Sequence, residues 1–367
     1  MGTITLRCLR GGNLKQALDL AVADREFVAL AGSGVSDIVR LIAGLEEIAD
    51  GEILFDDRRL NDLPARERDA AFLSHDYAPY PEMSVFDNLA VTLQHRKFAG
   101  SEVKKRSTAA AQALGLESKL EAKPASLSAE DQRFIGLARV MVRQPQVYLF
   151  DNPFAGLDRA AIERGRSVVV TLRQRAAATI LYAAGDLSEA LAFGARTVVL
   201  EGGTVHQDAD ARTVLQSPAN LSVATLFQDP PMNLVHGSVK RDRDAFVFRE
   251  KGDGTITVRW PVAGSRLLGL VEGPVVLGFH ASAVERAGSS SREGSPSPAL
   301  FRALIDRAEL KGGGTDLYLR TGEHDLVCRS LRWAGSDQAG HRSEFVIDPD
   351  QIRVYDEVSG RLLTPET

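Results

Sequence analysis

Short apolar runs alternate with segments of helical spacing through about residue 210. Runs of four to six mostly apolar residues predict strands, and apolar residues that recur every three or four positions predict helices. This alternation is typical of an α/β fold with a parallel sheet. The predicted strands are residues 3–6, 26–31, 147–150, 179–183, 196–200 and 203–207, and the predicted helices are 38–45 and 159–175.

The pattern changes near Pro230, where short alternating strands separated by glycine and charge begin. Such strands are typical of small β-barrels. The segment 288–298 is too polar and too rich in turn residues to pack, so we expect an exposed, mobile loop. The sequence therefore predicts two domains, 1–230 and 231–367. The strands expected in the second are 301–306, 316–320 and 325–329.

Composition excludes several classes of protein. The chain of 367 residues has 25% charged and 44% hydrophobic residues, which is ordinary for a soluble globular protein. Its net charge of −5 argues against nucleic-acid binding. Cys8 and Cys328 have no metal-ligand spacing and suit a reducing compartment. No secretory signal and no apolar run of about 18 residues occurs, so we expect no direct membrane insertion.

The strand at 147–150 ends abruptly in Asp151, Asn152 and Pro153. A carboxylate at the carboxyl end of a parallel strand lies where α/β proteins bind ligands, and it can hold Mg²⁺ for a nucleoside triphosphate. A buried strand that ends in an ordinary turn is the alternative interpretation.

A glycine turn, Gly32-Ser33-Gly34, joins the strand at 26–31 to the next helix, which is the context of a phosphate-binding loop. That loop requires four residues between its glycines and then a lysine. Here Ser33 alone separates the glycines and Val35 follows. Taken alone, these residues favour a tight turn that packs a helix against a sheet.

Several motifs together resemble the ATP-binding subunits of ABC transporters. They are FVALAG, RLIAGLEE, GEILFDDRRL, YAPYPEMSV, and LSAEDQR with GLAR before the Asp151 strand. The likeness runs from about Thr3 to the C-terminus and is strongest to carbohydrate importers of the maltose and glycerol-phosphate type. It implies a P-loop NTPase-like ABC ATPase domain with a helical subdomain at about 84–135. An all-β, OB-like (TOBE-type) regulatory barrel would follow, although Gly278-Phe279-His280-Ala281-Ser282 replaces the family's Gly-x-Arg-Pro-Glu.

The resemblance implies a site for ATP and Mg²⁺ that has lost several parts. Val35 or a gap replaces the phosphate-binding lysine, whose hydrogen bond is worth roughly 1.5–3 kcal/mol. Asp37 would repel phosphate. The implied positions are Gly32, Ser33, Gly34, Val35, Ser36 and Asp37 for nucleotide, Ser36 and Asp151 for metal, and Asp158 in the D-loop.

Three catalytic positions of the family also differ. Asn152 replaces the catalytic glutamate, Gly185 the switch histidine and His75 the Q-loop glutamine. An amide can orient a water but cannot take its proton, a step worth typically about 10²–10⁴-fold in rate. The signature, in the family Leu-Ser-Gly-Gly-Gln, is altered as well, with an acid directed at phosphate. It reads Leu127, Ser128, Ala129, Glu130 and Asp131.

The run 77–85 matches the family segment that helps to form the groove for the permease. Tyr77, Tyr80, Pro81 and Met83 are its expected docking residues. The alternative is a proline-rich loop that packs only on its own domain.

The leading hypothesis is therefore a catalytically degenerate subunit of an importer for a carbohydrate or polyol. It would lie at the cytoplasmic face of the inner membrane, paired with a second, intact ATP-binding subunit beneath the transmembrane permease subunits. One alternative is a working ATPase that uses His75 or Asp186 as base, with Asn152 orienting water. Another is a soluble regulator that acts through its C-terminal barrel.

Overall fold

A computed structural model describes residues 2–175, 178–226, 230–262, 272–287, 299–311, 314–330 and 339–363. The chain forms two compact units, Met1–Arg212 and Thr213–Thr367. The sequence pattern placed the boundary later, at residue 230. Residues 213–226 belong to the second unit because the hydroxyl of Tyr355 donates to the carbonyl of Pro218, and Leu221 N–H donates to the carbonyl of Gly360.

A six-stranded sheet forms the centre of the first unit, in the order β10-β9-β3-β8-β7-β6. Its strands are parallel except β10, which pairs antiparallel with β9. Every residue of β7 is buried, as expected for an interior parallel strand. The bounds are β3 Phe27–Ser33, β6 Ala70–Ser74, β7 Val147–Asp151, β8 Thr179–Ala183, β9 Arg196–Glu201 and β10 Thr204–Asp210.

A second sheet in this unit is antiparallel and has the order β2-β1-β4-β5. The sequence analysis did not predict β2, although its buried and exposed residues alternate. Both sheets share one apolar core with helix α1, in which Ile38, Leu41 and Ile42 pack with Ile4 and Ile53. The bounds are β1 Ile4–Gly11, β2 Leu18–Val22, β4 Ile48–Phe55 and β5 Arg58–Arg59.

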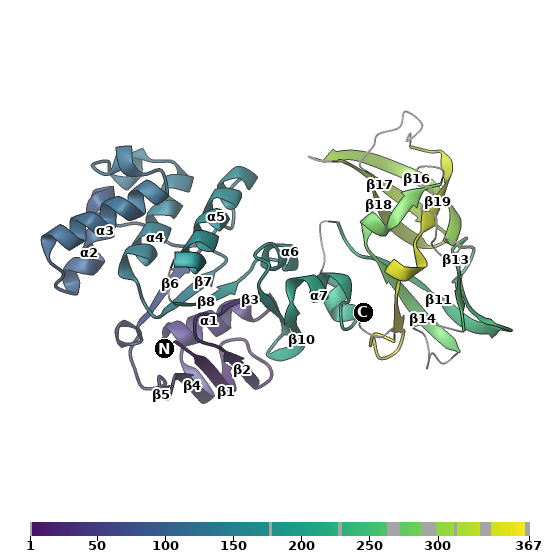
Figure 1. The fold of residues 1–367 in the computed structure, drawn as a ribbon, viewed down its shortest axis with the longest axis horizontal. Coiled ribbons are helices and arrows are strands. Elements are labelled where there is room, and N and C mark those ends of the chain that lie inside the picture. The colour runs from purple at the N-terminus through teal and green to yellow at the C-terminus, as the bar shows by residue number, and fades with distance from the viewer. Residues whose placement is uncertain are drawn as a thin grey trace. The chain divides into compact units, whose positions relative to one another are not determined.

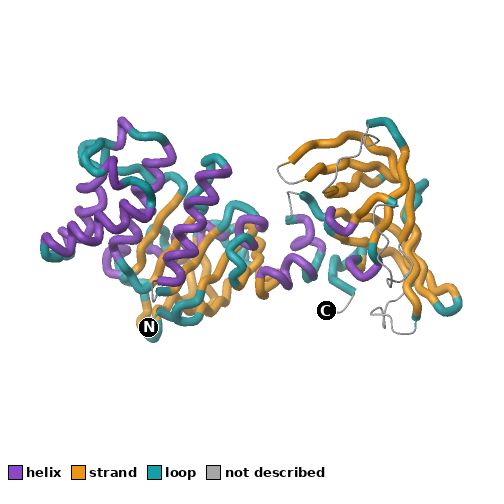
Figure 2. Tube along the Cα trace, turned by 45° about the horizontal axis from the view of Figure 1, so that its top comes forward, coloured by secondary structure: helices purple, strands orange, loops and turns teal. Residues whose placement is uncertain are grey.

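Helices α2, α3 and α4 pack on one another beside the six-stranded sheet (Figure 1). Figure 2 shows the same group of helices beside the strands of the sheet. Helix α4 contacts the sheet through β6. No described helix has the length and apolar character to cross a membrane. The helices of the first unit are α1 Val35–Ala43, α2 Val85–His95, α3 Gly100–Ala113, α4 Ala129–Arg143, α5 Arg159–Arg175 and α6 Leu187–Leu191, and α7 Ala211–Gln216 spans the boundary.

The second unit is all-β apart from short helices, as the sequence pattern indicated. Two five-stranded antiparallel sheets, β13-β12-β11-β14-β20 and β15-β19-β16-β17-β18, share one core. The loop expected at 288–298 lies outside the described residues. The bounds are α8 Leu221–Thr225, β11 Asn233–Asp242, β12 Ala245–Glu250, β13 Thr257–Pro261, β14 Gly273–Phe279, β15 Val284–Arg286, β16 Ala299–Lys311, β17 Gly314–Thr321, β18 His324–Ser330, β19 Arg342–Ile347 and β20 Arg353–Asp356.

Candidate functional site

The turn between β3 and α1 is one residue long. β3 ends at Ser33, α1 begins at Val35, and Gly34 alone joins them with a φ of 84°. A Cβ on Gly32 would lie 2.0 Å from the carbonyl oxygen of Leu200, so this position accepts no side chain. The backbone passes directly from strand to helix, with too few N–H groups to surround a phosphate.

Val35 occupies the expected lysine position and is buried, with 5% of its surface exposed. It belongs to the apolar core under α1. The turn after β1 covers the start of this helix, since the Nδ2 of Asn13 donates to the Oδ1 of Asp37 at 3.2 Å. The side chain of Leu14 lies 3.1 Å from where a Cβ of Gly34 would be. Apolar groups and a carboxylate therefore surround the position where a triphosphate requires cations.

Ser36 and Asp151 lie together at the carboxyl end of the sheet. The hydroxyl of Ser36 donates to the Oδ1 of Asp151 at 2.6 Å, and Asp151 is 2% exposed. A hydroxyl and a carboxylate are oxygen ligands that Mg²⁺ accepts. Among the predicted site residues, these two carry the side chains that could hold Mg²⁺.

Asn152 follows β7 in a left-handed conformation, with a φ of 42°, and its N–H donates to the carbonyl of Ala183 at 2.8 Å. Its side-chain amide packs on Gly185, where an added Cβ would lie 2.8 Å from the Nδ2 of Asn152. The structure thus brings the expected catalytic-glutamate and switch-histidine positions into contact. The amide of Asn152 takes no proton and Gly185 has no side chain, so neither residue can act as a general base.

Glu189, which the sequence analysis missed, fixes the segment around Gly185. Its Oε2 accepts the N–H of Gly185 at 2.7 Å, and its Oε1 accepts the hydroxyl of Tyr182 at 2.5 Å. The carboxylate of Asp186 accepts the N–H of Glu189 and caps α6. An acid at the N-cap followed three residues later by glutamate resembles a capping box, so this contact had a signal in the sequence.

His75 is exposed, and its backbone N–H donates to the carbonyl of Asp151 at 3.1 Å. Beside it, the hydroxyl of Ser74 donates to Asp76 and lowers the pKa of that carboxyl; His75 and Arg40 contribute in the same direction. The backbone of His75 therefore lies next to Asp151, the partner of Ser36.

The signature residues form the start of α4, where Ser128 is the N-cap and accepts the N–H of Asp131 at 3.1 Å. Both oxygens of Asp131 lie 2.7 Å from the Nζ of Lys119. Glu130 forms an ion pair with Arg164 of α5. The acid expected to repel a phosphate therefore has a cation beside it. The described geometry places Leu127 before the cap and Ala129 in the first turn.

Asp158 caps α5, since its Oδ1 accepts the N–H of Ala161 at 2.8 Å. The D-loop position is thus a helix cap at the start of the helix that carries Arg164.

Tyr77 and Tyr80, in the loop before α2, both contact the guanidinium of Arg139 in α4. Arg139 donates to the hydroxyl of Tyr77 at 2.9 Å and lies 4.6 Å from the ring centre of Tyr80. The buried amide of Asn88 bonds the N–H and the carbonyl of Tyr80 at 2.8 and 3.0 Å, which fixes the loop. Tyr80 is 47% exposed. Pro81 is also exposed and Met83 is half-buried, so the loop presents side chains at the surface.

Comparison with known proteins places these features in one family. Residues 16–155 match the family described as ABC transporter. The uncharacterized ABC transporter ATP-binding protein YcjV of Escherichia coli strain 536 is 34% identical over 320 residues, which is 85% of this chain and 84% of YcjV. The sn-glycerol-3-phosphate import ATP-binding protein UgpC of Bordetella avium is 37% identical over 265 residues, 70% of each chain.

A solved structure shows the same fold. The ATP-binding cassette MJ0796, in a dimeric post-hydrolysis state with ADP and Pi, superimposes with a TM-score of 0.51 at 23% identity. The match covers 57% of this chain and 99% of that one. That structure shows the fold, and the likeness to YcjV over most of both chains shows that the protein belongs to the family of ABC transporter ATP-binding proteins.

Proposed function

We propose that this chain is a non-hydrolysing ATP-binding-type subunit of an ABC importer, paired with a catalytically intact homologue. One observation carries the proposal: a one-residue turn and a buried Val35 stand where the family binds phosphate. Without the loop and the lysine, the described residues provide neither the family's run of backbone N–H groups nor its lysine ammonium to hold the β- and γ-phosphates. The residues present do not fit a triphosphate bound in the family's manner.

The Ser36–Asp151 pair supports weak binding of nucleotide with Mg²⁺ rather than hydrolysis. Ser36 and Asp151 retain a pair that suits Mg²⁺. Asn152 and Gly185 supply no base, and Glu189 holds the switch segment through the N–H of Gly185. We infer that any nucleotide held here together with Mg²⁺ is not hydrolysed.

The remaining surfaces support assembly. Tyr77, Tyr80, Pro81 and Met83 form a loop whose shape Asn88 and Arg139 fix, as a permease-docking surface requires. The Glu130–Arg164 pair removes the uncompensated acid from the signature segment. That segment therefore repels the phosphate of a nucleotide on the partner subunit less than its sequence indicates.

The solute is proposed from the relatives. UgpC of Bordetella avium is described as an sn-glycerol-3-phosphate import protein, which favours a carbohydrate or polyol-type solute for this transporter. The subunit would lie peripherally at the cytoplasmic face of the membrane, bound to permease subunits. The second unit, Thr213–Thr367, would be the regulatory TOBE-type domain.

Titration of the purified chain with ATP and Mg²⁺, followed by calorimetry, tests the proposal. We expect no ATP turnover and no binding in the low micromolar range. The Asp151→Asn variant is the control for any weak magnesium-dependent signal. Hydrolysis by the chain alone at the rate of an ordinary family member would overturn the proposal, and loss of that activity in His75→Ala would identify a non-standard base.

A further inference from the structure

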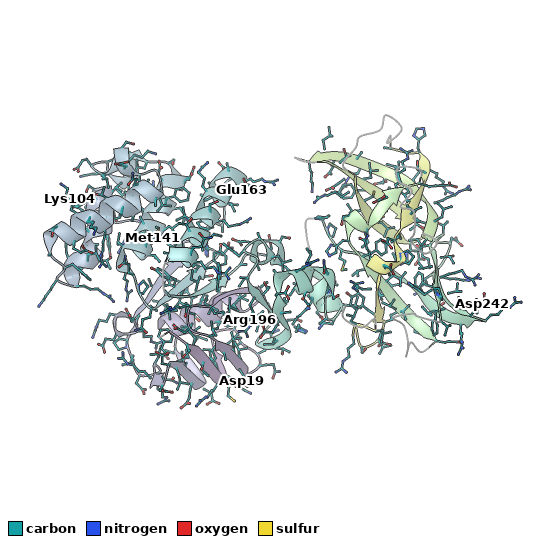
Figure 3. All side chains as sticks on the ribbon, viewed as in Figure 1. Asp19, Lys104, Met141, Glu163, Arg196 and Asp242 are labelled. Atoms are coloured by element: carbon teal, nitrogen blue, oxygen red, sulfur yellow. The ribbon has the colours of Figure 1, made fainter. Side chains whose placement is uncertain are left out.

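Side chains join the two sheets of the second unit at strands β11 and β18. β11, which ends at the Asp242 labelled in Figure 3, lies inside one sheet, and β18 is the edge strand of the other. At one connection, the amide of Asn233 donates to the carbonyl of Val327 at 2.9 Å and accepts its N–H at 2.6 Å. At a second connection, further along both strands, the N–H of His236 donates to the Nε2 of His324 at 3.0 Å.

The second connection fixes the protonation state of the His324 ring. A backbone N–H can only donate, so the Nε2 that accepts it carries no proton. The ring proton is therefore on Nδ1, which donates to the Oε1 of Glu250 at 2.7 Å. The side chain of Glu250 is fully buried, and its Oε2 accepts the N–H of Ile256 and the hydroxyl of Thr321, both at 3.0 Å. The neutral ring with its proton on Nδ1 is the form that satisfies both contacts.

Acid acts on this connection and not on the first one. A proton added to the Nε2 of His324 would face the N–H of His236, and two donors form no hydrogen bond. Rotation of the ring does not restore the bond, because Nδ1 is held by the buried Glu250. Since the connected form has one proton fewer at Nε2, lowering the pH favours the open form. The amide of Asn233 does not titrate, so its bonds to Val327 do not depend on pH.

The titratable groups that face the two rings are Glu250 of β12 and Glu357, which follows β20. The Nδ1 of His236 lies 2.8 Å from the Oε1 of Glu357, so each carboxylate contacts an Nδ1 and leaves the Nε2 of His324 to take the added proton. The rings of His236 and His324 are parallel within 10°, with centres 6.0 Å apart, so two protonated rings would repel each other. The charged residues next to these in the chain are exposed: Glu323 and Asp325 beside His324, and Lys251 and Asp253 after β12.

We propose that His324 is an acid-sensitive joint between the two sheets of the second unit. At neutral pH the neutral imidazole connects β11 to β18. When the pH falls, the protonated ring releases the N–H of His236 and the strands separate at that end, while Asn233 keeps them joined at the other. The ends of β12 and β17 meet at this joint through Glu250 and Thr321, so the release acts on both sheets. The joint uses only residues of the second unit and does not rest on the function proposed for the first.

Residue-resolved hydrogen–deuterium exchange of the full chain tests the joint at about pH 7.5 and about pH 5.5, because histidine ordinarily changes its charge between about pH 5 and 8. After correction for the intrinsic exchange rate at each pH, the protection of the His236 N–H should fall about three- to tenfold at the lower pH, as expected for the loss of one hydrogen bond. The protection of the Val327 N–H, which Asn233 holds, should not change. Unchanged protection of His236, or an equal loss at both N–H groups, would overturn the proposal.

Two histidine substitutions give a matched pair. His324→Gln places a side chain that does not titrate at the joint, whereas His341→Gln changes an exposed histidine of the same unit. We expect the pH dependence of the His236 N–H to disappear in His324→Gln and to persist in His341→Gln. Circular dichroism checks that each variant is folded, and the natural chain tests the joint by itself through the comparison of His236 with Val327. The same pH dependence in both variants would assign the effect to another group and overturn the proposal.

Discussion

Val35 and Ser36 are neighbours in sequence with opposite surroundings. The first residue of α1 points into the apolar core, and the second bonds to Asp151. Replacing a residue on this helix therefore does not by itself restore a phosphate site. The lysine of the family requires a loop that turns the chain so that its ammonium reaches the ligand, and that loop is reduced here to Gly34.

The first prediction concerns Val35→Lys. An ammonium at this position would be buried without an acid partner, so we expect the free energy of unfolding to fall by roughly 2–4 kcal/mol. We expect no gain in ATP binding. Urea unfolding and calorimetry measure the two effects, and Val205→Lys, at an exposed valine, is the control. Micromolar ATP binding by Val35→Lys would show that the missing cation alone was the defect.

The second prediction concerns pH and Asp316, whose side chain is 1% exposed. Two hydrogen bonds of 2.7 Å from Arg329 lower the pKa of this carboxyl in the folded state, and Lys311 adds to the shift. A lowered pKa means that the ionised pair stabilises the fold above its unfolded value of about 4, and that this stability is lost as pH falls through the folded pKa.

Asp316→Asn should therefore lower the free energy of unfolding at neutral pH by about 1–3 kcal/mol. The difference from the natural chain should shrink as pH falls below about 4. Urea unfolding at neutral and acid pH measures this, with the exposed Asp325→Asn as control. A difference that does not change with pH would show that shape, not charge, stabilises this contact.

At the scale of residues, the sequence indicated which positions form the candidate site but not which side chains pair with one another. The structure brings Asp151, Ser36, Asn152, Gly185 and His75 together at one end of the sheet. The partner of Glu130 did not emerge, because Arg164 is 34 residues away and only the packing of α4 and α5 brings the two together. Charge in sequence alone therefore overstated the repulsion in the signature segment.

At the scale of elements, long regular segments were predicted well and interrupted ones were not. The helix at Arg159–Arg175 and the strand at Thr179–Ala183 have the predicted bounds. β1 is longer than predicted because its pairing register shifts between Leu6 and Leu9, where Cys8 has a φ of 48°. An irregularity of this kind breaks the alternation that identifies a strand.

The third prediction concerns the loop before α2. Asn88 is fully buried, and its amide bonds the backbone of Tyr80, Met83 and Ser84. Asn88→Ala leaves those backbone groups unsatisfied, so we expect a loss of about 1–3 kcal/mol in unfolding free energy. We also expect weaker co-purification with the permease. Gln94→Ala, at an exposed position of the same helix, is the control. If Asn88→Ala co-purified with the permease as well as the natural chain does, the loop would not contribute to docking.

At the scale of the molecule, the sequence indicated an α/β unit followed by an all-β unit but not how the second is built. Its last strand, β20, pairs with β14, about 80 residues earlier in the chain. Residues 213–226 join this unit through contacts with Tyr355 and Gly360. Periodicity predicts where a strand lies and not which strand it pairs with, so the boundary could not be placed from pattern alone.

The last prediction concerns the assembled transporter. If this chain supports a dimer whose other subunit hydrolyses ATP, substitution at the catalytic-glutamate position should affect ATP turnover differently in the two subunits. Asn152→Ala here should change the turnover of the reconstituted complex by less than about twofold, because Asn152 takes no proton. Changing the catalytic glutamate of the intact partner to glutamine should lower turnover about a hundredfold or more. The ATP turnover of both complexes is measured in liposomes after equal subunit stoichiometry has been verified, and the comparison shows which subunit hydrolyses ATP. A hundredfold loss on Asn152→Ala would mean that this subunit hydrolyses ATP itself, and that an amide held against Gly185 is enough to position its water.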